Sequence, residues 1–160
     1  MQILKDLFTN HMIIVPLIAW AVSQVMKMFT YLIVEKKLVW KRIISDGGMP
    51  SAHSATVISL AVMCGWTQGF ASAAFAISII LAIIIMRDAV GVRRESGINA
   101  EAIKRLADKS NKNICEGEEK IITDKLKTLV GHTPMQVAFG CVIGIIVCLF
   151  YILIGNIPSV

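Results

Sequence analysis

Charged side chains are scarce in this chain, and their scarcity excludes an ordinary soluble domain. Only 17% of its 160 residues are Asp, Glu, Lys or Arg, whereas 56% are hydrophobic, and the mean hydropathy is +0.70. A soluble domain of this size carries about 25% charged residues and fewer apolar ones. We therefore expect a single integral membrane domain that covers residues 1–160.

Cysteines at a spacing suited to pairing are absent. Three of the four cysteines, Cys64, Cys141 and Cys148, lie in apolar stretches, where cysteine usually behaves as a small hydrophobic residue. The fourth, Cys115, is not spaced from the others as disulfide partners or metal ligands are. We expect no disulfide, no structural zinc and no other metal site.

The chain also lacks the interleaved basic and aromatic residues that mark a nucleic-acid surface. Its net charge is +5, but the basic residues alternate with acidic ones and flank apolar segments. This pattern excludes nucleic acid as the expected partner and favours a bilayer with anionic lipids. No small-residue cleavage site accompanies the first apolar run, so we expect that run to remain as a membrane helix.

Long apolar runs are what the chain has in abundance, and about 20 apolar residues span a bilayer core. They predict an all-α fold, a polytopic membrane helix bundle of about four transmembrane helices with an amphipathic interfacial helix near residues 99–112. The second span is short, which suggests that its start lies below the membrane surface, in a cavity walled by protein. The expected membrane segments are 13–34, 53–66, 70–88 and 134–154, joined by polar connectors at 35–52 and 89–131.

Four crossings place both charged connectors on the same face of the membrane. The positive-inside tendency assigns that face to the cytoplasm, so we expect a protein of a bacterial-type plasma membrane. The N-terminus, the turn at residues 66–69 and the C-terminus then lie outside.

Two short segments stand where a polar connector enters an apolar helix. Residues 47–53 read Gly-Gly-Met-Pro-Ser-Ala-His, and residues 131–136 read Gly-His-Thr-Pro-Met-Gln. In each, glycine frees the backbone, proline suits the first helical turn, and a histidine lies beside exposed amide donors. Because His53 and His132 face the same side of the membrane, the pair predicts a phosphate site.

Phosphoryl transfer from a monoester needs a nucleophile, an acid for the leaving oxygen and a cationic cradle. His53 and His132 can do the first two jobs. If the third apolar helix continues past residue 88, Arg87, Gly91 and Arg94 fall on one face. The glycine, which has no side chain, then leaves room beside the two guanidinium groups. The candidate phosphate ligands are Arg87, Arg93, Arg94, Lys27 and Ser51.

Structural roles for the same residues stay open. Thr133 and Gln136 match a helix capping box, so they could do no more than start the last helix. Ser51 is an ordinary helix-start residue, and Lys27 could extend its ammonium to the cytoplasmic interface. The three arginines could anchor a helix end to anionic lipid. Asp88 could orient an arginine or histidine, or pair with a neighbour.

Three motifs in order resemble the divergent branch of the type 2 phosphatidic acid phosphatase family, which is related to acid phosphatases and vanadium-dependent haloperoxidases. They are residues 48–55, 87–94 and 131–137, and the resemblance covers nearly the whole chain. It implies that His53, in Pro-Ser-Ala-His, protonates the leaving group and that His132 is the nucleophile.

This sequence departs from the superfamily pattern in three places. Gln136 occupies the position of the aspartate that orients the nucleophile, and a neutral amide cannot stabilise a histidinium as a carboxylate does. No arginine lies about seven residues before His132, so Arg87, Arg93 or Arg94 would have to act from a distance. The Lys-x6-Arg-Pro motif is also missing, and Lys27 is its only stand-in.

The expected function is a metal-independent, cofactor-free phosphatase that acts on a phosphatidate or a polyprenyl phosphate or diphosphate through a phosphohistidine on His132. The alternative is a noncatalytic lipid-phosphate binding or transport protein that retains the anion pocket. A purely structural bundle is disfavoured, because Lys27, His53 and the arginines would be costly to place in a membrane. Gly140 and Gly144 form a Gly-x-x-x-Gly pair suited to close helix contact, and a homodimer is possible.

Overall fold

The computed structural model describes residues 1–35, 48–111, 131–155 and 157, and every regular element among them is a helix. The fold class predicted from the sequence, an all-helical polytopic membrane bundle, is confirmed. The connector residues 36–47 and 112–130 lie outside the described part of the chain. The helices are α1 (Gln2–Thr9), α2 (His11–Glu35), α4 (Ala52–Gln68), α5 (Ala73–Val90), α6 (Val92–Asn111) and α7 (Pro134–Gly155).

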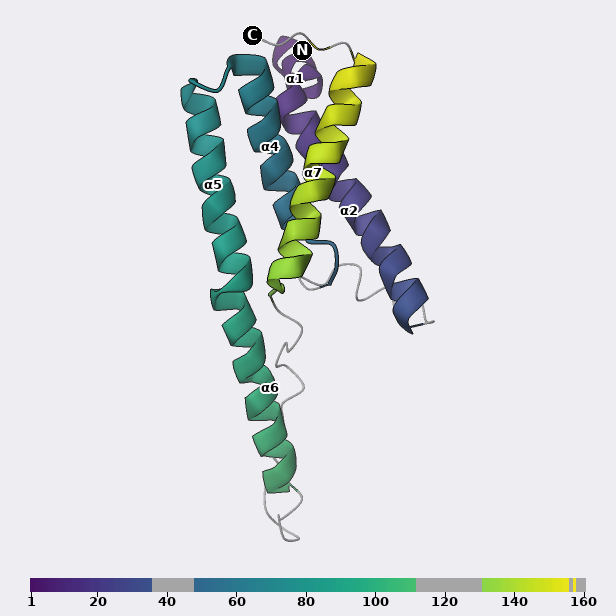
Figure 1. Ribbon diagram of the computed structural model, residues 1–160, viewed down its shortest axis with the longest axis vertical. Helices are drawn as coiled ribbons and strands as arrows, with labels where there is room; N and C mark the ends of the chain where they lie inside the picture. The colour runs from purple at the N-terminus through teal and green to yellow at the C-terminus, as the bar shows by residue number, and fades with distance from the viewer. Residues whose placement is uncertain (36–47, 112–130, 156, 158–160) are drawn as a thin grey trace.

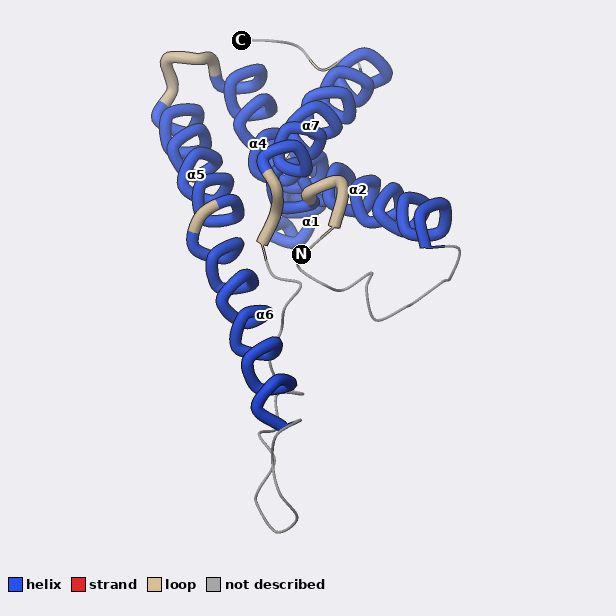
Figure 2. The backbone as a smooth tube through the Cα atoms, turned by 60° about the horizontal axis from the view of Figure 1, so that its bottom comes forward, coloured by secondary structure: helices blue, strands red, loops and turns tan. Residues whose placement is uncertain are grey.

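Helices α2, α4, α5 and α7 run alternately up and down beside one another (Figure 1). Both chain termini and the turn between α4 and α5 lie at one end of this bundle. The starts of α4 and α7 and the junction of α5 with α6 lie at the opposite end, where Figure 2 shows the loops before α4 and α7 in tan. The two histidine segments are therefore at the same end of the bundle.

Helix α4 is the centre of the bundle and packs against α2, α5 and α7. Small residues let the α7 backbone approach it closely. A Cβ at Gly140 would overlap the Ser51 carbonyl oxygen, and one at Gly144 would lie 2.6 Å from the Ala55 carbonyl oxygen. The Gly-x-x-x-Gly pair is thus used within the chain, and the homodimer, which stays a prediction, needs another surface.

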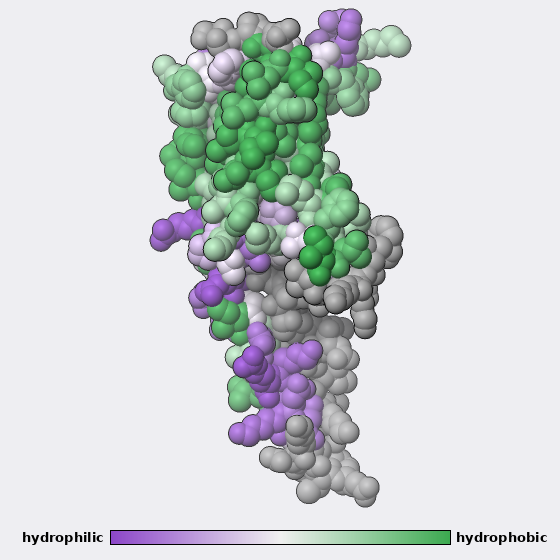
Figure 3. All heavy atoms as spheres, turned by 45° about the vertical axis from the view of Figure 1, so that its right-hand side comes forward, coloured by the Kyte–Doolittle hydropathy of each residue, from purple (hydrophilic) through white to green (hydrophobic). Residues whose placement is uncertain are grey.

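Three helical stretches among the described residues are long and apolar enough to cross a membrane: His11–Ile33, Ala73–Asn111 and Pro134–Gly155. Helix α4 has 17 residues, about 25 Å at ~1.5 Å per residue, and three other helices surround it. Figure 3 shows hydrophobic side chains over the bundle and hydrophilic ones gathered where α6 extends below it. The number of spans stays a prediction.

The helix boundaries differ from the expected ones in the second half of the chain. Helix α5 begins at Ala73 rather than residue 70, because the Ser72 hydroxyl accepts the backbone N–H of Phe75 at 3.2 Å and caps it. Helix α6 begins at Val92 rather than residue 99. Gly91 separates α5 from α6 with φ −97° and ψ −101°, far from the helical ψ of about −42°. The helical periodicity assumed from Arg87 to Arg94 is therefore interrupted.

Candidate active site

The start of α4 positions His53. The Ser51 hydroxyl accepts the backbone N–H of Ser54 at 3.4 Å and the Ser54 hydroxyl at 2.9 Å, and Ser51 is fully buried. The backbone N–H of Ser51 donates to the Gln136 carbonyl at 3.1 Å, which ties this helix start to the first turn of α7. His53 lies in the first turn of α4 and is exposed. Ser51 therefore caps the helix that carries His53.

The loop before α7 positions His132. Gly131 has φ +84°, and a Cβ there would overlap the backbone nitrogen of Arg94 and lie 2.5 Å from its Cα. The loop thus rests on the first turn of α6. The backbone N–H of His132 donates to the Ala89 carbonyl at 2.9 Å, and His132 is only 3% exposed. This histidine is held against the end of α5 by its own backbone.

Thr133 and Gln136 form the capping box that their spacing matches. The Gln136 side-chain oxygen accepts the Thr133 backbone N–H at 3.0 Å, and the Thr133 hydroxyl accepts the Gln136 backbone N–H at 3.3 Å. Such a reciprocal pair satisfies two amide donors at a helix start. The Gln136 side chain is therefore engaged in starting α7.

The two predicted histidines share one cavity. Their ring centroids are 6.4 Å apart, and the ring planes are nearly perpendicular at 82°. The volume of this cavity is about 230 Å³. We call this space the histidine cavity; its lining residues are His53, Ile84, Ile85, Asp88, Ala89, Arg93 and His132.

Of the three candidate arginines, Arg93 lines the histidine cavity, and Arg87 and Arg94 are not among its lining residues. The Arg93 Nε lies 2.5 Å from the Asp88 carboxylate, and the two side chains are 46% and 38% exposed. An ion pair this exposed adds little stability, but it fixes the direction of the guanidinium. Arg87 lies on α5, before the interruption at Gly91, and Arg93 and Arg94 lie after it, so the regular spacing that grouped Arg87 with Arg94 does not hold.

Lys27 lies deeper in the structure than an interfacial anchor would. It is only 2% exposed, and a Cβ at Gly48 would lie 3.4 Å from its side-chain Cδ. The lysine is therefore enclosed by protein beside the loop before α4. It is not among the residues that line the histidine cavity.

Asp88 is a cavity residue that the sequence-based list of site residues left out. Its pairing with Arg93, five positions later, crosses the break at Gly91, and regular helical spacing does not predict contact between residues five apart. Among the described residues, no three His, Cys, Asp or Glu side chains gather in a way that could hold a metal ion.

Comparison with known proteins gives two matches. Residues 8–147 match the family described as the Divergent PAP2 family. The chain is 40% identical over 150 residues to the uncharacterized membrane protein YuiD of Bacillus subtilis strain 168, a match that covers 90% of this chain and 95% of that protein. No solved structure matches the chain.

Proposed function

Because the chain belongs to the divergent PAP2 family, we propose that it is a membrane phosphatase for a phosphorylated lipid, of the phosphatidate or the polyprenyl phosphate or diphosphate type. The observation that carries this proposal is the approach of His53 and His132 to 6.4 Å in a cavity that an arginine also lines. We place the cavity at the cytoplasmic side of a bacterial-type plasma membrane, on the charge asymmetry of the connectors.

In the proposed first step, His132 attacks the phosphorus of the bound lipid phosphate. A nitrogen–phosphorus bond forms and the bond from phosphorus to the lipid oxygen breaks, while His53 gives its proton to that oxygen. In the second step, His53 takes a proton from water, the water oxygen attacks phosphorus, and inorganic phosphate and free His132 are released. Arg93 neutralises the charge that spreads over the phosphoryl oxygens.

The burial of the two histidines fits these different roles. His132 is buried and held by its backbone, which suits a preorganised nucleophile, whereas the exposed His53 can meet both alcohol and water.

Phosphate release from a panel of lipid phosphates, measured on detergent-purified protein, tests the proposal. His132→Ala should abolish both turnover and an acid-labile phosphoenzyme, and His53→Ala should slow turnover most for lipids whose leaving group needs a proton. His11→Ala is the matched control, because this histidine makes a 3.0 Å hydrogen bond with Tyr151 at the end of the bundle away from the histidine cavity (Figure 1). Full activity in purified His132→Ala protein would rule out the phosphohistidine mechanism.

A second candidate function, a noncatalytic lipid-phosphate binding or transport protein, is favoured by one observation. Gln136, at the position of the superfamily aspartate, carries a neutral amide that cannot stabilise a cationic His132 as a carboxylate does, and its side-chain oxygen already accepts the Thr133 backbone N–H. Vanadate binding by wild-type protein without any phosphate release would favour this candidate. Gln136→Asp is the companion test, because a restored carboxylate that reaches the ring should raise the rate.

A further inference from the structure

A second, apolar depression lies along the exposed face of α5, next to the histidine cavity. It has a volume of about 460 Å³. Ile84 lines both spaces, so the two are neighbours along α5. We call the depression the α5 groove; its lining residues are Ala76, Ile77, Ile80, Leu81 and Ile84.

The α5 groove leads from the polar end of the bundle toward its middle. The lining positions recur at helical spacing and form one stripe on α5. From Ile84 back to Ala76 the helix axis rises about 12 Å, in the direction of the turn between α4 and α5 (Figure 1). Ile77, Ile80 and Ile84 are 69%, 56% and 59% exposed. The groove is thus open to whatever hydrocarbon surrounds the bundle.

We propose that the α5 groove holds a hydrocarbon chain of the phosphorylated lipid whose phosphate occupies the histidine cavity, an inference that rests on the proposed function. Head and tail of a lipid are covalently joined, so a phosphate between the two histidines has to send its tail out past the cavity wall. Ile84 lines both the histidine cavity and the α5 groove, so a tail that leaves the cavity beside Ile84 meets the groove.

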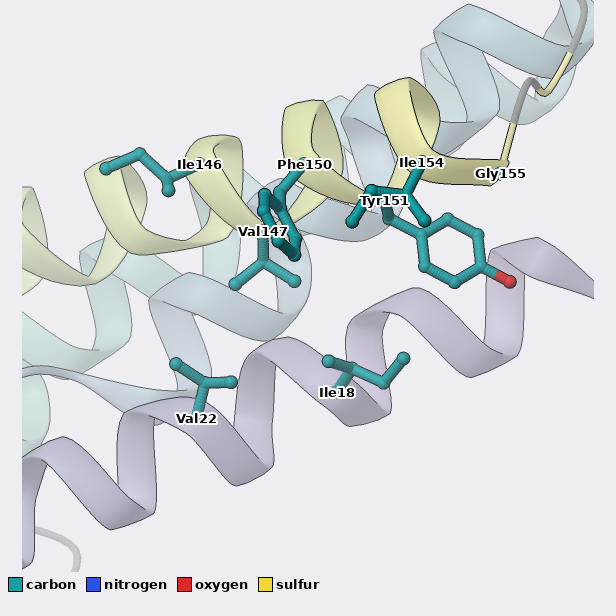
Figure 4. A pocket seen from close by; sticks show the side chains of 8 residues that line it. All are labelled: Ile18, Val22, Ile146, Val147, Phe150, Tyr151, Ile154 and Gly155. Carbon is teal, nitrogen blue, oxygen red and sulfur yellow. The ribbon is translucent and has the colours of Figure 1, made fainter.

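A second apolar groove provides a matched comparison. It has a volume of about 470 Å³ and lies between α2 and α7 (Figure 4). It shares no lining residue with the histidine cavity, whereas the α5 groove shares Ile84 with it. Its lining residues are Ile18, Val22, Ile146, Val147, Phe150, Tyr151, Ile154 and Gly155.

The α5 groove would contribute to the reaction by aligning the lipid tail, and not through the hydrophobic effect. Lipid tails are already as apolar as the helix surface, so burial against α5 brings little hydrophobic gain. Alignment of the tail fixes where the phosphate lies, and a misplacement of about 1 Å can cost about 100-fold in rate. Filling the groove should therefore affect long-chain lipid phosphates and spare soluble phosphate esters.

The experiment is photolabelling in phosphatidylcholine vesicles with a phosphatidate that carries a diazirine in one acyl chain. We expect label on peptides that contain residues 76–84, displaced by unlabelled phosphatidate and not by diacylglycerol. Ile80→Trp, which fills the groove, should remove most of that label. Ile146→Trp, the same change on the groove between α2 and α7, should leave it unaltered.

Catalytic measurements on the same variants separate the two proposals. Ile80→Trp should lower kcat/KM for long-chain phosphatidate while hydrolysis of a soluble phosphate monoester stays unchanged, which also shows that the variant folds. Ile77→Trp is the second variant if Ile80→Trp does not fold.

Each outcome decides one of the proposals. Three results would overturn the α5 groove while leaving the phosphatase proposal standing. They are label on α2 or α7, displacement of the label by diacylglycerol as well as by phosphatidate, and label that is unchanged in both Ile80→Trp and Ile77→Trp. Headgroup-dependent label on α5 without any phosphate release would overturn the phosphatase and support the groove.

Discussion

Replacing Gly131 by alanine should damage both the stability of the protein and its histidine cavity. Gly131 has φ +84°, and a Cβ there would lie 2.5 Å from the Cα of Arg94. Gly69 is a matched control within the same chain, because it has φ +85° but nothing within 4 Å of an added Cβ. The two glycines thus share a positive φ and differ in the space beside the added Cβ.

The two substitutions differ by the cost of the clash. A residue with a Cβ at such a positive φ costs about 1–3 kcal/mol, and this is the whole expected cost of Gly69→Ala, because nothing lies within 4 Å of its added Cβ. Forcing a methyl group into occupied space adds about 1–3 kcal/mol. At about 2–4 °C per kcal/mol for a chain of this size, Gly131→Ala should lower Tm by about 2–12 °C more than Gly69→Ala.

Activity should separate the same pair. A methyl group at Gly131 pushes the loop away from α6 and weakens the bond from the His132 N–H to the Ala89 carbonyl, which is 2.9 Å long. A shift of about 1 Å in the histidine should lower kcat/KM by about 100-fold. The measurements are thermal unfolding in detergent and phosphate release well below Tm. Equal Tm losses for the two variants, together with full activity of Gly131→Ala, would refute the proposed seating of the loop.

Three other experiments test further parts of the structure. Arg93→Lys should weaken vanadate binding by about tenfold, because an ammonium lacks the planar fork of the guanidinium. Arg105→Lys, far along α6, is the control. Equal vanadate affinities of the two variants would show that Arg93 does not bind the phosphate. Gln136→Ala should lower the free energy of unfolding by about 0.5–2 kcal/mol through loss of the capping box, whereas Gln136→Glu should retain that stability. Chemical denaturation measures the stability of both variants. An alanine variant as stable as the wild type would contradict the capping box. A single cysteine at Gln68 should react with an impermeant reagent on whole cells, and one at Lys109 only after permeabilisation; reaction of both from one side would overturn the four-crossing topology.

Much of the fold follows from interactions close along the chain. Apolar runs of bilayer length predict the helices, and hydrogen bonds within three or four residues start them. The Ser51 cap and the Thr133–Gln136 capping box both have this short spacing, which is why they are visible in the sequence. The Gly140 and Gly144 pair also predicts a close helix contact, although not that its partner is the start of α4.

The histidine cavity depends on contacts between distant segments, which spacing along the chain does not encode. Sequence motifs nominate His53 and His132, but only the packing of α4 against α7 and the end of α5 brings their rings to 6.4 Å. Regular helical periodicity groups Arg87 with Arg94. In the structure the helix is interrupted at Gly91, and the arginine that lines the cavity is Arg93, which pairs with Asp88. Local sequence determines that a helix forms and where it starts. The rotation of each helix about its axis, which decides the side chains that meet, is set by the neighbours it packs against.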